Sequence, residues 1–169
     1  LGAVIPETPI NVLNTGISGN RVTDLEARWQ NDVLDLEPNW LSVMVGINDV
    51  WRQFDAEPCA EQVEPELYEL VYRSVLARTR PQLDGLVLMT PYFLETNRED
   101  PMRVKMDAYG EITKKMAVEF DAILVDTQLA FDHYLAHQST DSLCPDRVHP
   151  NGVGHMILAR AFLSAFGMS

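Results

Sequence analysis

Short, continuous apolar runs are separated along the chain by longer stretches in which apolar residues recur every three or four positions. Continuous runs are typical of strands that are buried on both faces of a parallel sheet. They predict four strands, at residues 10–13, 40–45, 86–90 and 122–125. Gly46 and Pro91 follow the second and third runs and predict where those strands end.

The longer stretches predict five helices. The first opens at Thr23, which has capping-box spacing to Glu26, and its apolar side ends near Leu36. The others are expected at residues 64–80 and 102–120, from Asp126 and Thr127 toward residue 137, and at residues 150–166. Strand and helix therefore alternate through the whole chain.

Such alternation predicts a parallel sheet with helices on both faces, which is a three-layer α/β/α sandwich. The 169 residues suffice for one domain with a buried core, and no linker or repeat divides residues 1–169. In this fold class the ligand site lies at the carboxyl edge of the sheet. Polar residues that follow the strands are therefore the candidate functional residues.

The formal net charge of −12 argues against a nucleic-acid surface and against docking on anionic membranes, because both need clustered cations. No apolar run reaches the ~20 residues that span a bilayer, and the chain does not open with a signal peptide. We therefore expect a cytoplasmic protein whose acidic surface keeps it soluble.

The cysteines and histidines do not form a recognisable metal motif. Cys59 and Cys144 lie far apart, without the spacing of a zinc site or of a disulfide framework. His133 and His137 are four residues apart on a predicted helix, a spacing that can bind a metal ion, but no third ligand is evident. We expect two surface or half-buried histidines, no metal and no cofactor.

Three polar or glycine-rich clusters follow predicted strands or precede the last helix. Residues 14–20 contain two glycines, which either direct a backbone N–H outward or simply make a tight turn. Asn48 follows Gly46 and either presents its amide to a ligand or bonds its own backbone. Asp146 lies three residues before His149, so the acid either orients the imidazole and compensates its charge or caps a turn.

Together, the three clusters resemble sequence blocks of the SGNH hydrolases, also called GDSL esterases. Gly19 matches the second block, residues 46–49 match the G-x-N-D block, and residues 146–150 match the D-x-x-H-P block. The resemblance covers essentially the whole chain. It implies the flavodoxin-like SGNH fold and hydrolysis of small acetyl or acyl esters through a covalent acyl-enzyme.

The resemblance also implies roles for individual residues. His149 would be the general base and Asp146 would orient it, while the Gly19 backbone N–H and the Asn48 side chain would stabilise the oxyanion. Arg147 could contact a substrate oxygen or pair with a surface carboxylate. The residues that could line the substrate pocket are Asp49, Trp51, Arg52, Tyr92 and Arg147.

The first block of the family, Gly-Asp-Ser, carries the nucleophilic serine and does not occur in this chain. Ser18 is the only serine near a matched block, and its position belongs to the second block. We therefore expect that the first strand and helix of the fold are absent from this chain. Its open edges would pair with the missing N-terminal segment or with a second copy, and the chain alone would have no appreciable esterase turnover.

Two other hypotheses fit the same residues. The chain could be a non-catalytic SGNH-like domain that binds a ligand or a protein partner in the same cleft. Alternatively, a different nucleophile such as Ser18 could act. Cys144 is close to Asp146 in sequence, but no base is placed to convert its thiol to a nucleophilic thiolate.

Overall fold

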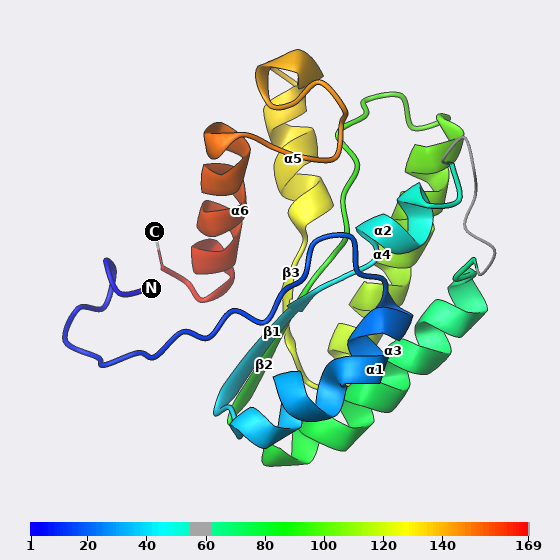
Figure 1. Ribbon diagram of the computed structural model, residues 1–169. Coiled ribbons are helices and arrows are strands. Elements are labelled where there is room, and N and C mark those ends of the chain that lie inside the picture. Colours follow the sequence, from blue (N-terminus) through cyan, green and yellow to red (C-terminus); the bar gives the residue numbers. More distant parts are fainter. Residues whose placement is uncertain (55–61, 169) are drawn as a thin grey trace.

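A computed structural model describes residues 1–54 and 62–168 and has a parallel three-stranded sheet between two layers of helices (Figure 1). The strands lie in the order β1-β2-β3. Their bounds are Trp40–Met44 for β1, Gly85–Met89 for β2 and Ile123–Val125 for β3. All pairs are parallel, with Leu41 opposite Leu86 and Leu88 opposite Leu124. The three-layer architecture predicted from the alternation of elements is confirmed.

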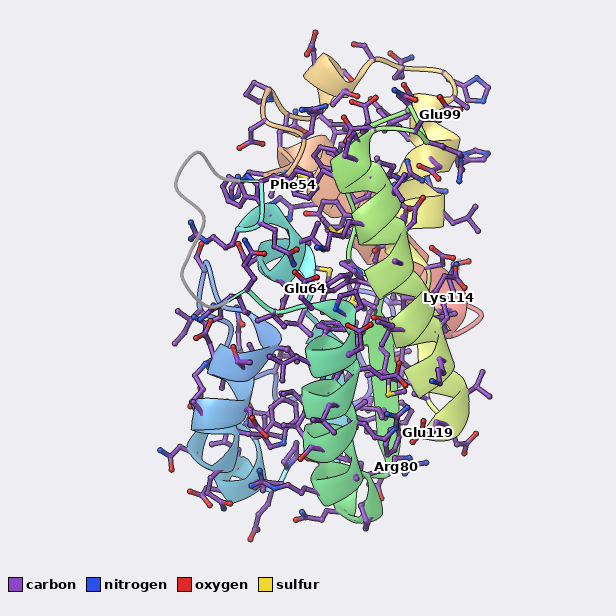
Figure 2. All side chains as sticks on the ribbon, turned by 90° about the vertical axis from the view of Figure 1, so that its right-hand side faces the viewer. Phe54, Glu64, Arg80, Glu99, Lys114 and Glu119 are labelled. Carbon is purple, nitrogen blue, oxygen red and sulfur yellow. The ribbon has the colours of Figure 1, made fainter. Side chains whose placement is uncertain are left out.

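Helices cover both faces of the sheet (Figure 1). One layer consists of α1 (Val22–Asp32), α3 (Pro65–Thr79) and α4 (Pro101–Glu119), and the other of α5 (Thr127–Leu135) and α6 (Gly152–Ala165). The short helix α2 (Ile47–Trp51) follows β1 directly. Figure 2 looks onto the layer of α1, α3 and α4, whose outer face carries charged side chains such as Glu64, Lys114 and Glu119.

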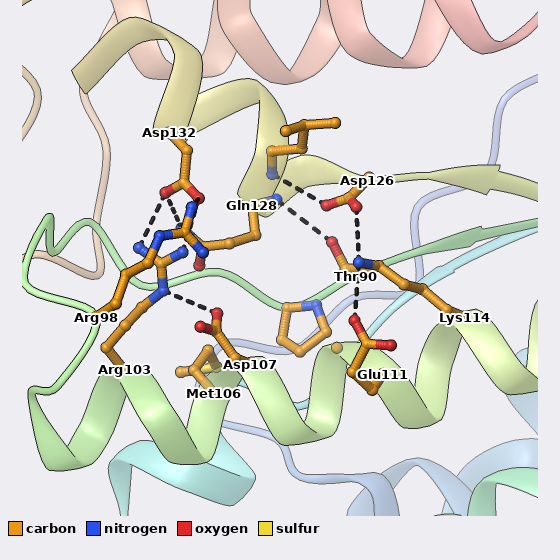
Figure 3. Close-up of a pocket in the computed structure, with 13 residues that line it drawn as sticks. Thr90, Arg98, Arg103, Met106, Asp107, Glu111, Lys114, Asp126, Gln128 and Asp132 are labelled. Atoms are coloured by element: carbon orange, nitrogen blue, oxygen red, sulfur yellow. Dashed lines mark hydrogen bonds and ion pairs between the residues drawn. The ribbon is translucent and has the colours of Figure 1, made fainter. Parts of the chain in front are cut away.

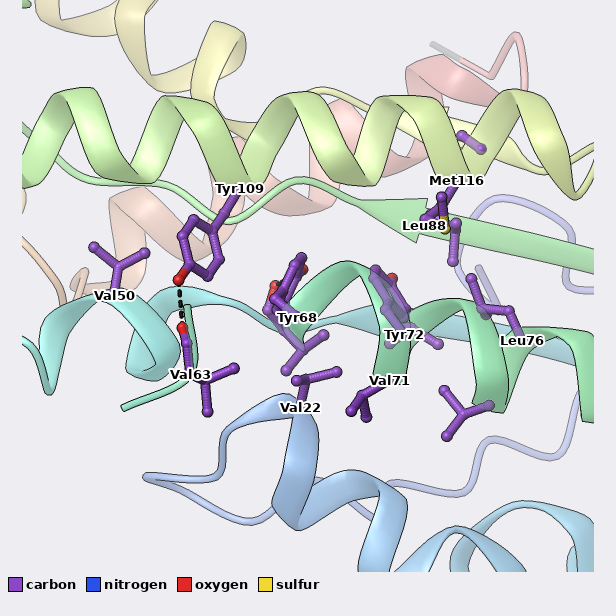
Figure 4. Close-up of a cluster of buried hydrophobic side chains, with 14 of the residues drawn as sticks. Val22, Val50, Val63, Tyr68, Val71, Tyr72, Leu76, Leu88, Tyr109 and Met116 are labelled. Atoms are coloured by element: carbon purple, nitrogen blue, oxygen red, sulfur yellow. Dashed lines mark hydrogen bonds between the residues drawn. The ribbon is translucent and has the colours of Figure 1, made fainter. Parts of the chain in front are cut away.

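The larger part of the core lies between the sheet and the layer of α1, α3 and α4. Tyr68 and Tyr72 of α3 are fully buried among aliphatic side chains from neighbouring elements, including Val22 and Leu88 (Figure 4). Burying one large apolar side chain contributes roughly 1.5–3 kcal/mol. A second cluster joins the other helical layer to the loop before α6 and contains Tyr92, Leu94, Phe131, Leu135, Leu143, Cys144 and Leu158.

Residues 10–13 do not form a strand, so this prediction is wrong. The side chains of Val12 and Leu13 are 75% and 60% exposed. A strand is stabilised only when a neighbour completes its hydrogen bonds, and within the described chain β1 pairs only with β2. Residues 1–20 instead form an irregular segment that leads to the start of α1 (Figure 1).

The strand β1 is therefore an edge strand among the described residues, and the expectation that both of its faces are buried is also wrong. Val43 is only 5% exposed, whereas Trp40 and Met44 are 51% and 41% exposed. The central strand β2 does have the expected burial, since Leu86, Val87 and Leu88 are each at most 2% exposed.

Capping side chains shift two of the predicted helix boundaries. The N-cap of α1 is Arg21 rather than Thr23, and its backbone N–H donates to the Asp24 carboxylate at 2.8 Å. The side chain of Asn151 caps α6, so this helix begins at Gly152 instead of residue 150. The remaining predicted helices match to within two residues, but α2 was not predicted. Cys59 lies outside the described residues.

None of the described helices combines the length and the apolar character that a bilayer crossing requires.

Candidate active site

The turn after β1 places Asn48 at the carboxyl edge of the sheet. Gly46 has φ of 122°, and a Cβ there would lie 3.0 Å from the Pro91 ring and 3.1 Å from the Tyr68 hydroxyl, so this position requires glycine. Asn48 lies in α2, and its side-chain amide donates to the backbone carbonyl of Asn20 at 3.1 Å. This bond joins the start of α2 to the loop that contains Gly19.

Gly19 lies in a β-turn in which the Asn20 backbone N–H donates to the Ile17 carbonyl at 3.3 Å. Its φ of 84° is the conformation that a type II turn requires at the third position, which explains the glycine. The two predicted oxyanion donors, Gly19 and Asn48, are therefore held on adjoining segments. They come from positions that are far apart in the sequence, as the resemblance implied.

The Asp146 carboxylate is organised around His149. Its Oδ2 lies 2.7 Å from the imidazole Nδ1, while its Oδ1 accepts the backbone N–H groups of Val148 at 3.0 Å and His149 at 2.9 Å. Hydrogen bonds from the backbone and ring of His149 hold the pKa of Asp146 well below its usual range. An ionised Asp146 keeps a proton on Nδ1 and leaves the Nε2 lone pair available to a substrate or nucleophile.

Residues that follow β2 fix the loop that carries this pair. The Arg147 carbonyl accepts the Leu94 backbone N–H at 2.9 Å, and the Tyr92 hydroxyl donates to the Val148 carbonyl at 3.3 Å. Arg147 itself has a left-handed backbone with φ of 63°. Val148, which lies between Asp146 and His149 in the sequence, is buried and attaches the loop to the core.

Ring contacts connect the imidazole to the oxyanion donors. The Trp51 ring lies 5.4 Å from the His149 ring at 74° between planes, and the Arg52 guanidinium lies 5.6 Å from the centre of the Trp51 ring. A guanidinium nitrogen of Arg52 comes within 3.4 Å of the position that a Cβ of Gly19 would take. Because Trp51 and Arg52 follow Asn48 in the same short segment, His149, Asn48 and Gly19 lie near one another at the carboxyl edge of the sheet.

The five predicted pocket residues do not share one environment. Asp49 and Tyr92 are 1% and 4% exposed, so they lie beneath the site and cannot line it. Arg147 pairs with the Glu95 carboxylate at 2.6 Å and stacks on the Phe93 ring. Of the two alternatives for Arg147, the structure therefore has the pair with a carboxylate. Only Trp51 and Arg52 are partly exposed beside His149 and Gly19.

Two partners of the site, Asn20 and Glu95, were not predicted from the sequence. Asn20 accepts the Asn48 amide through its backbone carbonyl, a group that every residue type has. Glu95 holds Arg147 across 52 positions of sequence, and no spacing rule connects two residues so far apart.

No serine within the described residues hydrogen-bonds to His149, whose side chain is 60% exposed. Ser18 is exposed in the turn beside Gly19, and Ser169 lies outside the described residues. Cys144 is 3% exposed, and burial raises the pKa of its thiol, so it is a poor source of thiolate.

A separate pocket of about 180 Å³ lies between α4 and α5 (Figure 3). Its charged side chains are largely paired with one another, for example Arg103 with Asp132 and Lys114 with Asp126. None of the residues predicted from the motifs lines it. His133 is exposed on α5 and His137 is exposed in the turn after it, and the described part of the chain holds no cluster of three potential metal ligands.

Comparison with known proteins gives consistent matches over nearly the whole chain. The model of the GDSL-like lipase/acylhydrolase family matches residues 1–157. An acetylxylan esterase of Geobacillus stearothermophilus is 50% identical over 168 residues, which cover 99% of this chain and 77% of that protein. Its crystal structure matches with a TM-score of 0.96 at 49% identity, covering 99% of this chain and 77% of that chain.

Further solved structures match equally well. An alpha/beta hydrolase from the metagenome of Lake Arreo, Spain, has a TM-score of 0.95 at 49% identity, covering 98% of this chain and 77% of that chain. Catalytic mutants of the Geobacillus esterase, with a serine, a histidine or an aspartate replaced by alanine, match with TM-scores of 0.96.

Proposed function

The chain belongs to the GDSL-like lipase/acylhydrolase family of carboxylic ester hydrolases, and on this premise we propose that, joined to a preceding serine-bearing segment, it removes acetyl groups from acetylated xylan fragments by Ser-His-Asp catalysis. The observation that carries the proposal is the 2.7 Å contact between Asp146 and the His149 ring, beside a turn that holds Gly19 next to Asn48. The 50% identity to an acetylxylan esterase supports the choice of an acetylated sugar as substrate.

The mutants of the relative support the roles of Asp146 and His149. In that esterase the replaced aspartate precedes the replaced histidine by three positions, the separation of Asp146 and His149 here. The replaced serine of the relative lies farther before its aspartate than the 145 residues that precede Asp146 in this chain. We therefore place the nucleophilic serine on a segment before Leu1.

The open side of β1 supports a strand from that segment as the carrier of the serine. Among the described residues β1 pairs only with β2, and the apolar side chains of Trp40 and Met44 beside it are exposed. A parallel strand there would complete the hydrogen bonds of β1 and cover these side chains. Its carboxyl end would then lie at the edge of the sheet that carries Asn48.

In the proposed reaction the serine hydroxyl gives its proton to His149 Nε2 while its oxygen attacks the acetyl carbonyl carbon. The carbonyl electron pair moves onto oxygen, where the Gly19 N–H and the Asn48 amide would each contribute about 3–4 kcal/mol. The tetrahedral intermediate expels the sugar oxygen, which takes the proton from His149. Water then repeats these steps and releases acetate, with Asp146 compensating the imidazolium charge each time.

A serine-reactive fluorophosphonate tests the proposal. It should label a protein that extends this chain with the residues encoded before Leu1, at a serine within a Gly-Asp-Ser sequence. The 169-residue chain should remain unlabelled, and it should hydrolyse p-nitrophenyl acetate at only a background rate. Absence of labelling in both proteins would instead favour the non-catalytic binding domain.

Replacement of Ser18 by alanine tests the alternative nucleophile. Under the proposal, the extended protein with Ser18→Ala keeps its labelling and its hydrolysis of p-nitrophenyl acetate. If this variant lost both while remaining folded, Ser18 would be the nucleophile and the assignment to a preceding serine would be wrong.

A further inference from the structure

Asp49 is an acidic side chain buried beside one of the proposed oxyanion donors. It is 1% exposed and directly follows Asn48 in α2. Its Oδ1 accepts the backbone N–H of Val22 at 2.9 Å, while its Oδ2 has no hydrogen-bond partner in the described structure. Burying a carboxylate that is not fully satisfied is costly.

The surroundings of Asp49 do little to compensate its charge. The phenols of Tyr68 in α3 and Tyr109 in α4 interact electrostatically with Asp49, but the Tyr68 hydroxyl donates to the Val45 carbonyl and the Tyr109 hydroxyl to the Val63 carbonyl. The charged groups that act on Asp49 are Arg21 and Asp24 at the start of α1, and they have opposite signs. Burial outweighs the hydrogen bonds from the backbone N–H groups of Val22 and of Asp49 itself, and it raises the pKa of Asp49 to about 6.

Two consecutive residues of α2, Asn48 and Asp49, form hydrogen bonds with the segment that follows Gly19. The Asn48 amide bonds the Asn20 carbonyl at 3.1 Å, and the Asp49 carboxylate bonds the Val22 N–H at 2.9 Å. These two bonds determine where the Gly19 turn lies relative to the Asn48 carboxamide. Val22 is itself fully buried against the core near Tyr68, so the second bond also fixes the start of α1 (Figure 4).

We propose that Asp49 is a positioning residue, whose ionised carboxylate holds the Gly19 turn against Asn48 so that both present their N–H groups to one anion. The inference rests on the proposed function, because Gly19 and Asn48 are oxyanion donors only there. A proton added to the unpartnered Oδ2 removes the negative charge. Charge-assisted hydrogen bonds are roughly twice as strong as neutral ones, so protonation weakens the bond to Val22 and loosens the Gly19 turn.

Amide NMR of the 169-residue chain between pH 4 and pH 8 tests this coupling. The backbone amides of Val22 and Gly19 should shift with one common midpoint near the pKa of Asp49, about 6. Because His149 also contacts Trp51 at the site, the titration is repeated with His149→Asn, where the shared midpoint should persist. If Gly19 did not titrate with Val22, or lost its midpoint in His149→Asn, the proposal would be overturned.

Two substitutions of Asp49 separate positioning from general stability. Asp49→Asn keeps an acceptor for Val22 and should abolish the shared midpoint. Asp49→Ala removes the acceptor and should speed hydrogen exchange at the Val22 amide at least tenfold and shift the Gly19 amide resonance. The matched control is Asp126→Asn, which alters a carboxylate that accepts the Leu129 N–H at the start of α5 and should leave both amides unchanged.

The outcome does not depend on catalysis, because neither a substrate nor a serine nucleophile takes part. Failure of phosphonate labelling would remove the proposed function and leave the coupled titration in place. Persistence of the Gly19 midpoint in Asp49→Asn, or equal exchange rates in Asp49→Ala and the intact chain, would overturn the positioning role even if the enzyme were active. If both variants failed to fold, the titrations of the unmodified chain and of His149→Asn would still decide the question.

Discussion

At the scale of single residues, the two oxygens of Asp146 have different partners. Oδ1 binds backbone N–H groups and so fixes where the loop lies, whereas Oδ2 binds the ring and so fixes the imidazole. Half-exposed ion pairs contribute little to stability. We therefore expect substitutions of Asp146 to affect turnover far more than folding.

The first prediction concerns Asp146→Asn in the serine-bearing protein. The asparagine amide can direct its NH₂ to Nδ1, which leaves the imidazole in the wrong tautomer and its developing charge uncompensated. We expect kcat on p-nitrophenyl acetate to fall on the order of 10⁴-fold. Asp141→Asn, an exposed carboxylate of the same loop, is the control and should keep full activity. A loss below tenfold for Asp146→Asn would remove Asp146 from the reaction.

The second prediction concerns Asn48→Ala. Removal of one oxyanion donor should lower kcat by about 10²–10³-fold while KM changes little, because the lost interaction forms only in the transition state. Asn39→Ala, an exposed amide at the opposite end of β1, should leave both constants unchanged. A large rise in KM with unaltered kcat would show that Asn48 binds the substrate rather than the oxyanion.

At the scale of elements, the sequence predicted those that depend on local signals. The apolar runs at residues 86–90 and 122–125 gave β2 and β3, and most helices matched within two residues. The strand predicted at residues 10–13 is absent because an apolar run does not reveal whether a neighbouring strand is present to pair with it. Thr23 is not the N-cap of α1, because the Asp24 carboxylate accepts the backbone N–H of Arg21 and the helix begins one residue earlier. Arginine is not among the residue types favoured at the N-cap, so this start was not predicted.

The third prediction concerns how the free energy of unfolding depends on pH because of Asp49 in α2. Its folded pKa of about 6 is raised above the ordinary 3.8. The stability from this group is therefore fully present below pH 3.8 and is lost as the pH rises through about 6. At pH 8 the loss in unfolding free energy is at most about 3 kcal/mol.

Urea unfolding at pH 4 and at pH 8 measures this loss. Asp49→Asn should gain stability relative to the unmodified chain at pH 8 and much less at pH 4. Asp84→Asn, an exposed carboxylate at the other end of the sheet, should show no such difference between the two pH values. An equal effect of Asp49→Asn at both values would contradict the raised pKa.

The fourth prediction compares two glycines at the starts of helices. Gly46→Ala forces a side chain into φ of 122° and against Pro91, which should cost about 2 kcal/mol and lower Tm by roughly 4–8 °C. Gly152→Ala at the start of α6 meets nothing within 4 Å and should leave Tm unchanged or slightly raised. Equal Tm values for the two variants would show that the turn before α2 tolerates side chains.

At the scale of the whole molecule, the two faces of the sheet are unequally covered. The helices α1, α3 and α4 enclose the larger core cluster, whereas α6 buries only Gly154 and Leu158 of its 14 residues. On the side of α6, the Trp40 ring of β1 lies 5.7 Å from the Phe166 ring that follows this helix, yet Trp40 remains 51% exposed.

The fifth prediction follows from this uncovered side. An open edge strand recruits other strands, so the 169-residue chain should self-associate in sedimentation experiments as its concentration rises. Met44→Lys on β1 should shift the chain toward the monomer because it charges the edge. Val118→Lys, at an 86% exposed position of α4, should not. Unchanged association in both variants would place the contact elsewhere.

Much of the candidate site could be anticipated because glycine, asparagine and the Asp-x-x-His spacing are local signals of backbone geometry and chemistry. Burial was not predictable in the same way. Asp49 and Tyr92 looked like pocket residues from their place after strands, yet both face inward. Whether a side chain at a strand end faces the solvent or the core depends on elements that pack from elsewhere in the sequence.

In the 169-residue chain the side chain of His149 is 60% exposed. On the proposed function, a serine close enough to give its proton to Nε2 would cover part of this ring. Joining the preceding segment should therefore screen the imidazole from solvent and leave it in contact with the reacting groups alone.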